Sequence, residues 1–208
     1  MMKDLDGIYD RAFFSEWGRG NESYVKTAEF ITRIIHGEFR PRRLVDLGCG
    51  CGVYAHFFKD LGTEVVALDG VQPPPELSFP VSVELRDLTE PFSNEWGVFD
   101  LALCLEVAEH ISEELSGTFL GNIAQFSDTL VLSCARPKQG GAHHVNEKPK
   151  RYWHERLKSF GFEYNRPRTG VLQEAFKAGK PQLMWMCQQI SVYEKPGVEG
   201  WAGEKLLP

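Results

Sequence analysis

The chain has 208 residues, of which 42% are hydrophobic and 25% charged, and its formal net charge is −6. This is the composition of a globular protein, and the length suits one domain that folds without disulfides or a structural metal. The negative charge argues against unspecific nucleic-acid binding. The charged first twenty residues lack the apolar core of a signal peptide, and no apolar run reaches the length of a membrane helix. We therefore expect a cytoplasmic protein without membrane contact.

Short apolar runs alternate with amphipathic stretches, which is typical of βαβ units and a mostly parallel sheet. The periodicity predicts helices at 21–39, 53–61, 112–126, 149–160 and 171–177. It predicts strands at 43–47, 64–68, 81–85, 99–105, 129–133, 162–166 and 182–193. Asn21 and Ser112 are suited to cap two of these helices. The predicted fold class is α/β, with a doubly wound sheet.

The most informative segment is a glycine loop between the first strand and the next helix. It reads Asp46-Leu47-Gly48-Cys49-Gly50-Cys51-Gly52. In an open α/β sheet, ligands bind at the carboxyl ends of the strands, where glycines let the backbone approach closely. A dinucleotide site would need a different glycine spacing, and Asp46 would repel a pyrophosphate. A cationic ligand such as S-adenosylmethionine (SAM) fits the carboxylate better.

Two further acidic residues follow the next two predicted strands. Asp69 ends the second strand, where a carboxylate can accept the ribose hydroxyls of an adenosine. Asp87 follows the third strand and is placed to reach the adenine edge. Each aspartate alone is more typical of a turn or a helix cap. Three of them at successive strand ends favour a nucleoside pocket.

With these residues the sequence resembles the class I SAM-dependent methyltransferases, over 44–132. The resemblance implies a Rossmann-like, seven-stranded sheet whose last strand is antiparallel. It also implies that Asp46 and the loop residues hold the methionine part, Asp69 and the adjacent Gly70 the ribose, and Asp87 with Leu88 the adenine, while Glu106 lines the methyl-donor face. The implied cofactor residues are thus Asp46, Gly48, Cys49, Gly50, Gly52, Asp69, Gly70, Asp87, Leu88 and Glu106.

A second motif, Glu106-Val107-Ala108-Glu109-His110, follows the fourth strand. If this turn is helical, its two carboxylates and its imidazole share one face and can bind a divalent metal, with His143 or His144 as a further ligand. The pattern resembles the metal-dependent 2′-O-methyltransferases of small-RNA 3′ ends. The same motif also occurs in metal-free methyltransferases of small molecules, where it shapes the pocket. We favour the metal-free interpretation and keep Glu106, Glu109, His110 and His144 as the alternative metal site.

A glycine-rich loop, Gly140-Gly141-Ala142-His143-His144-Val145-Asn146-Glu147, precedes Tyr152 and Trp153. Together with the second motif, this loop resembles a group of small bacterial and phage methyltransferases. A general base adds typically ~10²–10⁴-fold to a proton-coupled reaction, and histidine suits a hydroxyl acceptor near neutral pH. The candidate catalytic residues are His143, His144 and His110. A mobile loop with surface imidazoles is the alternative interpretation.

The two ends of the predicted domain carry weaker signals. We divide the chain into an N-terminal aromatic flap and helix at 1–40, the methyltransferase domain at 41–195 and a tail at 196–208. The flap carries Tyr9, Phe13, Phe14 and Trp17, which either cover the pocket or only pack against the domain. Nine Lys or Arg residues against three Asp or Glu lie between 136 and 168. They form either a solvated face or a positive rim for an anionic substrate.

The predicted function is SAM-dependent methyl transfer to an oxygen or nitrogen of a small molecule. The expected acceptor is an anionic sugar, a nucleotide or a natural-product intermediate. The alternative is the metal-assisted methylation of an RNA 3′ end, which the net charge argues against but leaves open. The spacing of the glycine loop speaks against an NAD-dependent oxidoreductase. A non-catalytic SAM-binding module is a third class, and the sequence assigns no oligomeric state.

Overall fold

A computed structural model of the chain describes residues 7–198. Residues 1–6 of the predicted N-terminal segment and residues 199–208 of the predicted tail lie outside the described residues. Its centre is a seven-stranded sheet of order β3-β2-β1-β4-β5-β7-β6. The strands are β1 Arg43–Leu47, β2 Glu64–Asp69, β3 Val83–Leu85, β4 Leu101–Leu105, β5 Thr129–Ser133, β6 Glu163–Tyr164 and β7 Ser191–Glu194. Strands β1 to β5 pair in parallel, and β7 runs antiparallel to both of its neighbours. The predicted α/β class and the antiparallel last strand are confirmed.

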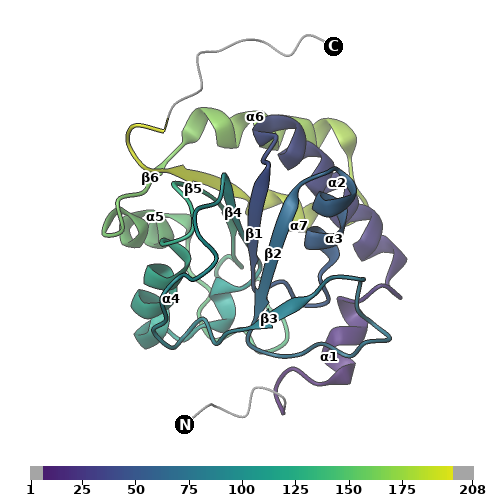
Figure 1. Cartoon of the computed structure of the whole chain (residues 1–208). Helices are drawn as coiled ribbons and strands as arrows, with labels where there is room; N and C mark the ends of the chain where they lie inside the picture. Colours follow the sequence, from purple (N-terminus) through teal and green to yellow (C-terminus); the bar gives the residue numbers. More distant parts are fainter. Residues whose placement is uncertain (1–6, 199–208) are drawn as a thin grey trace.

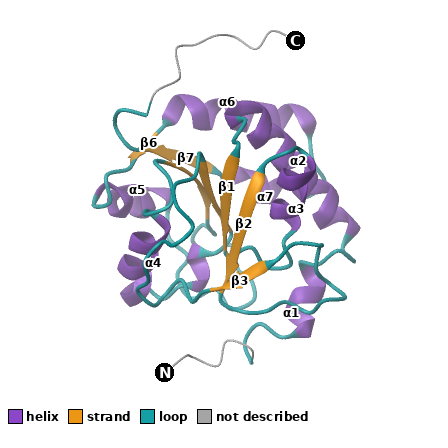
Figure 2. Cartoon of the chain, viewed as in Figure 1, coloured by secondary structure: helices purple, strands orange, loops and turns teal. Residues whose placement is uncertain are grey.

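Helices cover both faces of the sheet (Figures 1 and 2). They are α1 Arg11–Glu16, α2 Glu22–Phe39, α3 Val53–Asp60, α4 Ser116–Ile123, α5 Lys150–Lys158, α6 Arg166–Gly179 and α7 Met184–Gln188, with short 3₁₀ turns at Ala108–His110 and Glu113–Leu115. None of the helices in this described range is long and apolar enough to cross a membrane.

Alternation along the strands assigns side chains to the two faces. In β4, Leu103 packs with α2, α3, α6 and α7, whereas its neighbour Cys104 packs with α4 and α5. Both strand faces are therefore buried, which explains why the central strands are continuous apolar runs rather than alternating ones.

Local sequence signals correctly predicted the bounds or the caps of several elements. Strands β1 and β5 have the predicted bounds, and Asn21 caps α2 by accepting the backbone N–H of Tyr24 at 3.2 Å. Helix α6 is longer than predicted, because Asn165 caps it by accepting the N–H of Arg168 at 2.9 Å. Arg166, predicted to end a strand, is instead the first residue of this helix.

Two predicted elements are wrong in extent. The helix expected at 112–126 is a 3₁₀ turn followed by α4, and the Ser112 side chain makes no capping bond. The strand expected at 182–193 contains helix α7 at Met184–Gln188, and only Ser191–Glu194 pair with the sheet. Gln173 of α6 donates to the carbonyls of Cys187 and Ile190, both at 2.9 Å, so that these groups are satisfied outside a strand ladder.

Candidate active site

A cavity of about 780 Å³ lies at the carboxyl ends of the parallel strands, and its volume is typical of a small-molecule site. Its walls come from α1, the glycine loop, the ends of β2 and β4, the loop at 139–145 and α7. Helix α1 lies at the end of the sheet opposite to α6 (Figure 1). This is the place where open α/β sheets bind ligands.

The glycine loop forms one wall of the cavity, and its backbone requires glycine. Gly48, Gly50 and Gly52 have φ values of +77°, +53° and +78°. A Cβ at Gly48 would lie 2.4 Å from a methyl group of Val107, whereas a Cβ at Gly50 would meet nothing within 4 Å. Gly50 therefore leaves its side of the loop open, while Gly48 permits close packing against the turn after β4.

Asp69 at the end of β2 ties this loop in place and lines the cavity. Its carboxylate accepts the N–H of Gly50 at 2.7 Å and that of Val71 at 3.0 Å. Burial raises the pKa of this carboxyl above its usual value. Asp87 and Leu88 also line the cavity, and the Asp87 carboxylate accepts the N–H and the hydroxyl of Thr89 at 2.8 and 2.7 Å.

Most of the predicted cofactor residues lie together at this end of the cavity. The lining contains Gly48, Cys49, Gly50, Asp69, Gly70, Asp87, Leu88 and Glu106. Asp46 and Gly52 are not among the lining residues. Asp46 is only 2% exposed, and burial raises its pKa to about 7. Asp46 is therefore buried outside the cavity lining, and its contact with the cofactor stays a prediction.

Glu106 and Glu109 bring two carboxyl groups to the cavity lining. Glu106 has a φ of +56°, which is uncommon for a residue with a side chain, and its carboxylate accepts the Ser133 hydroxyl at 2.6 Å. Glu109 is fully buried, and its Oε1 accepts the N–H of Ala135 at 3.0 Å. Its Oε2 has no hydrogen-bond partner among the described residues. Burial and the nearby Glu106 raise the pKa of Glu109 well above its usual value.

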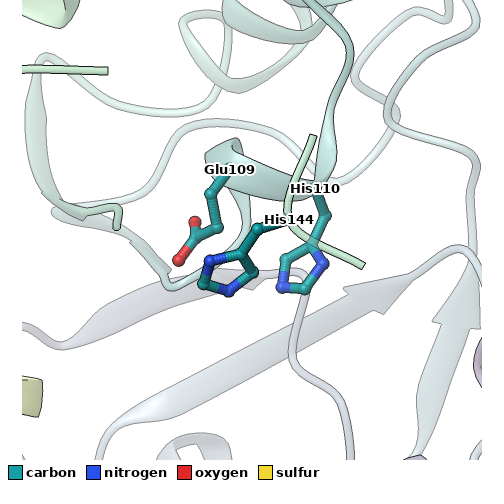
Figure 3. Close-up of side chains that lie close together, drawn as sticks. All are labelled: Glu109, His110 and His144. Carbon is teal, nitrogen blue, oxygen red and sulfur yellow. The ribbon is translucent and has the colours of Figure 1, made fainter. Parts of the chain in front are cut away.

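Three histidines complete this side of the cavity, and they differ in environment. The rings of His110 and His144 are 5.0 Å apart. Burial, together with the charge of His144, lowers the pKa of His110 to about 4, so that this imidazole is neutral at pH 7. His143 is exposed and has a φ of +60°. Figure 3 shows Glu109, His110 and His144 converging, and one ligand atom from each lies within 4.8 Å of the others. Glu106 is not part of this group.

Glu147 is a residue of the site that the sequence analysis missed. Its Oε1 lies 3.0 Å from Nδ1 of His144, and its carboxylate accepts the N–H of Lys138 at 2.8 Å and of Gly140 at 2.7 Å. The side chain of Glu147 thus holds His144 and closes the loop on itself. The spacing of three residues between the histidine and the glutamate is the only sequence signal for this pair.

Aromatic side chains from α1 and the segment before it cover the cavity. Tyr9, Phe13, Phe14 and Trp17 all line it. The Tyr9 ring lies 5.8 Å from that of His110 and 5.9 Å from that of His143. Burial, with the charges of Asp69 and Glu109, raises the pKa of Tyr9 to about 12. Tyr9 therefore lies near both the nucleoside end and the histidine end of the cavity.

Other residues singled out in the sequence lie elsewhere. Trp153 is fully buried in the core beneath α4, and neither it nor Tyr152 lines the cavity. The basic segment between 136 and 168 does not form a rim. Lys148 pairs with Glu113 at 2.6 Å and Arg168 with Glu194 at 2.6 Å, and no Lys or Arg of residues 7–198 lines the cavity.

Comparisons with known proteins show what the sequence and the fold of this chain resemble. No protein-family model matches the chain. The ubiquinone biosynthesis O-methyltransferase of Ruegeria pomeroyi is 35% identical over 109 residues, which cover 42% of this chain and 42% of that protein. The chain therefore matches less than half the length of this curated relative.

Solved structures resemble the chain over a larger part of its length. The 1,6-didemethyltoxoflavin N1-methyltransferase of Burkholderia thailandensis, solved with its acceptor and S-adenosylhomocysteine (SAH), has a TM-score of 0.59 at 18% identity over 92% of this chain and 89% of that one. Human N-acetylserotonin methyltransferase with SAM has a TM-score of 0.58 at 13% identity, over 93% of this chain and 59% of that one. These likenesses show the fold. The chain is thus similar in part of its sequence to an O-methyltransferase, and in its fold to methyltransferases solved with SAM or SAH.

Proposed function

We propose that this protein is a SAM-dependent methyltransferase that methylates an oxygen or nitrogen of a small molecule. One observation carries the proposal: a single cavity is lined by the glycine loop, by Asp69 and by His144, whose Nδ1 lies 3.0 Å from Oε1 of Glu147. A nucleoside-binding wall and a candidate proton acceptor therefore face the same enclosed space. The relatives and structural neighbours that are named as methyltransferases support this assignment.

The residues present fit SAM. Asp69 would accept the ribose hydroxyls, Asp87 and Leu88 would contact the adenine, and the backbone of Gly48 to Gly50 would border the methionine part. The lining includes the acidic residues Asp69, Asp87, Glu106 and Glu109, which suit a ligand with an ammonium and a sulfonium group. When bound, SAM supplies the methyl group for an in-line displacement. The protein contributes alignment, the exclusion of water and the removal of the acceptor proton.

His144 is the strongest of the three candidate bases. Its Nδ1 is held by Glu147, which leaves Nε2 to take a proton. His143 is exposed and His110 has a strongly lowered pKa, so both are less suited. Glu147 is a positioning residue in this proposal, because it acts through His144.

Calorimetric titration with SAH tests the cofactor assignment. The wild-type protein should bind SAH, and Asp69→Ala should bind it at least tenfold more weakly, because the ribose acceptor is lost. Asp69→Asn separates loss of charge from loss of the loop contacts. Asp60→Asn is the matched control, because this exposed aspartate of α3 only pairs with His56 at 3.5 Å. Absence of SAH binding to the wild type would overturn the proposed function.

Turnover is followed as SAH released from SAM in a pool of small-molecule acceptors. His144→Ala should abolish this release and retain SAH binding. Unchanged release in the variant would remove His144 from the role of base.

A second candidate function follows from the cluster of Glu109, His110 and His144 (Figure 3). Two imidazoles and a carboxylate can hold a divalent metal, and the unpartnered Oε2 of Glu109 fits a cation. A metal here would polarise vicinal hydroxyls, as the RNA 3′-end alternative requires. Titration of Mn²⁺ into metal-free, SAH-saturated protein tests it. Binding that disappears in Glu109→Gln and persists in Asp60→Asn would favour this candidate, and no binding would dismiss it.

A further inference from the structure

The half of the cavity beyond the nucleoside end is walled by rings. Phe13 lies 5.0 Å from Tyr9, 6.2 Å from His110 and 6.1 Å from His143, measured between ring centroids. Trp17 lies 6.0 Å from Trp185 of α7, and all of these residues line the cavity. Rings prefer edge-to-face and offset-stacked neighbours, so a wall built of packed rings favours a flat ring lying against it.

The ionisable groups that line this region are carboxyl groups and imidazoles, and no Lys or Arg of residues 7–198 lies among the lining residues. Glu106 and Glu109 lie beside the histidines, and the buried Oε2 of Glu109 has no hydrogen-bond partner within residues 7–198. An anionic group brought into this space would be desolvated next to carboxyl groups without a cation to compensate it. A hydroxyl or amino group can instead hydrogen-bond to the carboxyl groups and imidazoles of this region without burying an anionic charge.

The nearby cations are held elsewhere. Lys148 pairs with Glu113, and the Nζ of Lys150 donates to the carbonyl of Gln188 at 3.1 Å. Turning either side chain into the cavity would break these contacts and bury a charge. Lys148 and Lys150 are therefore not available to compensate an anionic acceptor.

We propose that the acceptor is a compound with a planar aromatic ring, neutral or cationic, that presents a hydroxyl or amino group towards Glu109 and His144. The inference rests on the proposed function and names its substrate class. It replaces the anionic sugar or nucleotide considered from the sequence. Phe13 and Tyr9 would hold the ring, and Glu109 would accept a hydrogen bond from the donor group.

Three probes that share one phenol ring test the charge preference. They are 4-hydroxybenzyl alcohol, 4-hydroxybenzylamine and 4-hydroxybenzoate, titrated calorimetrically into SAH-saturated, metal-free protein. The alcohol or the amine should bind at least tenfold more tightly than the benzoate. 4-(Hydroxymethyl)cyclohexanol tests the need for a planar ring and should bind more weakly than the aromatic alcohol. Adenosine 5′-monophosphate represents the anionic nucleotide class and should not bind at this site.

Variants locate the binding to the ring walls. Phe13→Ala should weaken the binding of the favoured probe at least fivefold, and Phe13→Leu, which keeps most of the volume, should weaken it less. Phe57→Ala is the control, because this partly buried ring on α3 lies outside the cavity. Val145→Lys, at an exposed lining position, should strengthen benzoate binding by adding the missing cation.

The outcomes separate the two proposals. If SAH binds and the benzoate or the nucleotide binds as tightly as the alcohol and the amine, the inference on the acceptor is wrong while the methyltransferase proposal stands. If SAH binds and none of the phenols does, the inference is also wrong. If SAH does not bind, both proposals fall.

Discussion

The Nδ1 atom of His144 lies 3.0 Å from the Oε1 atom of Glu147, three residues further along the same loop. The same carboxylate accepts the backbone N–H groups of Lys138 and Gly140, so one side chain both orients the imidazole and folds the loop. Val145 and Asn146 dock this loop by donating to the carbonyl of Glu109 at 2.9 and 3.0 Å. The loop is therefore ordered by hydrogen bonds rather than by an apolar core.

Removing Glu147 should loosen the loop and leave the fold intact. In Glu147→Ala, the amides of Lys138 and Gly140 lose their acceptor, and we expect their hydrogen exchange to speed up at least tenfold. SAH release from SAM should fall with it, because His144 loses its fixed orientation. Exchange is measured residue by residue, with Glu174→Ala on α6 as the control for an exposed glutamate. Equal exchange in both variants would contradict this role of Glu147.

The two glycines of the loop should differ in their tolerance of a methyl group. Gly48→Ala combines a left-handed backbone with a Cβ 2.4 Å from Val107, and we expect it to destabilise the protein by about 2–4 kcal/mol. Gly50→Ala has open space and should cost only about 1 kcal/mol of backbone strain. Urea denaturation measures both. In Gly48→Ala combined with Val107→Ala, part of the loss should be recovered, and no recovery would show that the contact with Val107 is not the cause.

Asp46 should make the stability of the unliganded protein depend on pH. Burial raises its pKa from 3.8 to about 7, so the folded state holds a proton that the unfolded state releases. The contribution of Asp46 to stability is thus fully present below about pH 4 and is lost as the pH rises through 7. We compare the melting temperature of Asp46→Asn with that of wild type at each pH. The difference, variant minus wild type, should be several degrees larger at pH 8 than at pH 5. A difference that is the same at both values would show that Asp46 is not the buried charge responsible.

Helix α1 should be less accessible when the cavity is filled. Its aromatic residues line the cavity, so a ligand beneath them adds contacts that oppose local opening. Cleavage by trypsin after Arg11 and Arg19 should slow in the presence of SAH. Cleavage after Lys177, in the last turn of α6, should not change. Both are followed by mass spectrometry, and equal rates at Arg11 and Arg19 with and without SAH would contradict the flap proposed for the N-terminal segment.

The sequence by itself determined the sheet and the nucleoside end of the cavity. Strands such as Arg43–Leu47 are short apolar runs, and the glycines and Asp69 stand at strand ends, so that spacing along the chain is enough to place them. The helical period and the N-cap at Asn21 act within a few residues and are equally local.

Only the tertiary structure decided the other half of the site. The contact of Tyr9 with His110 and the ion pair of Lys148 with Glu113 join residues far apart in the chain. Packing also leaves Asp46 outside the cavity lining. The segment 184–188 became a helix because Gln173 and the neighbouring helices satisfy its polar and apolar groups. Such contacts depend on how elements pack in three dimensions, and no local period encodes them.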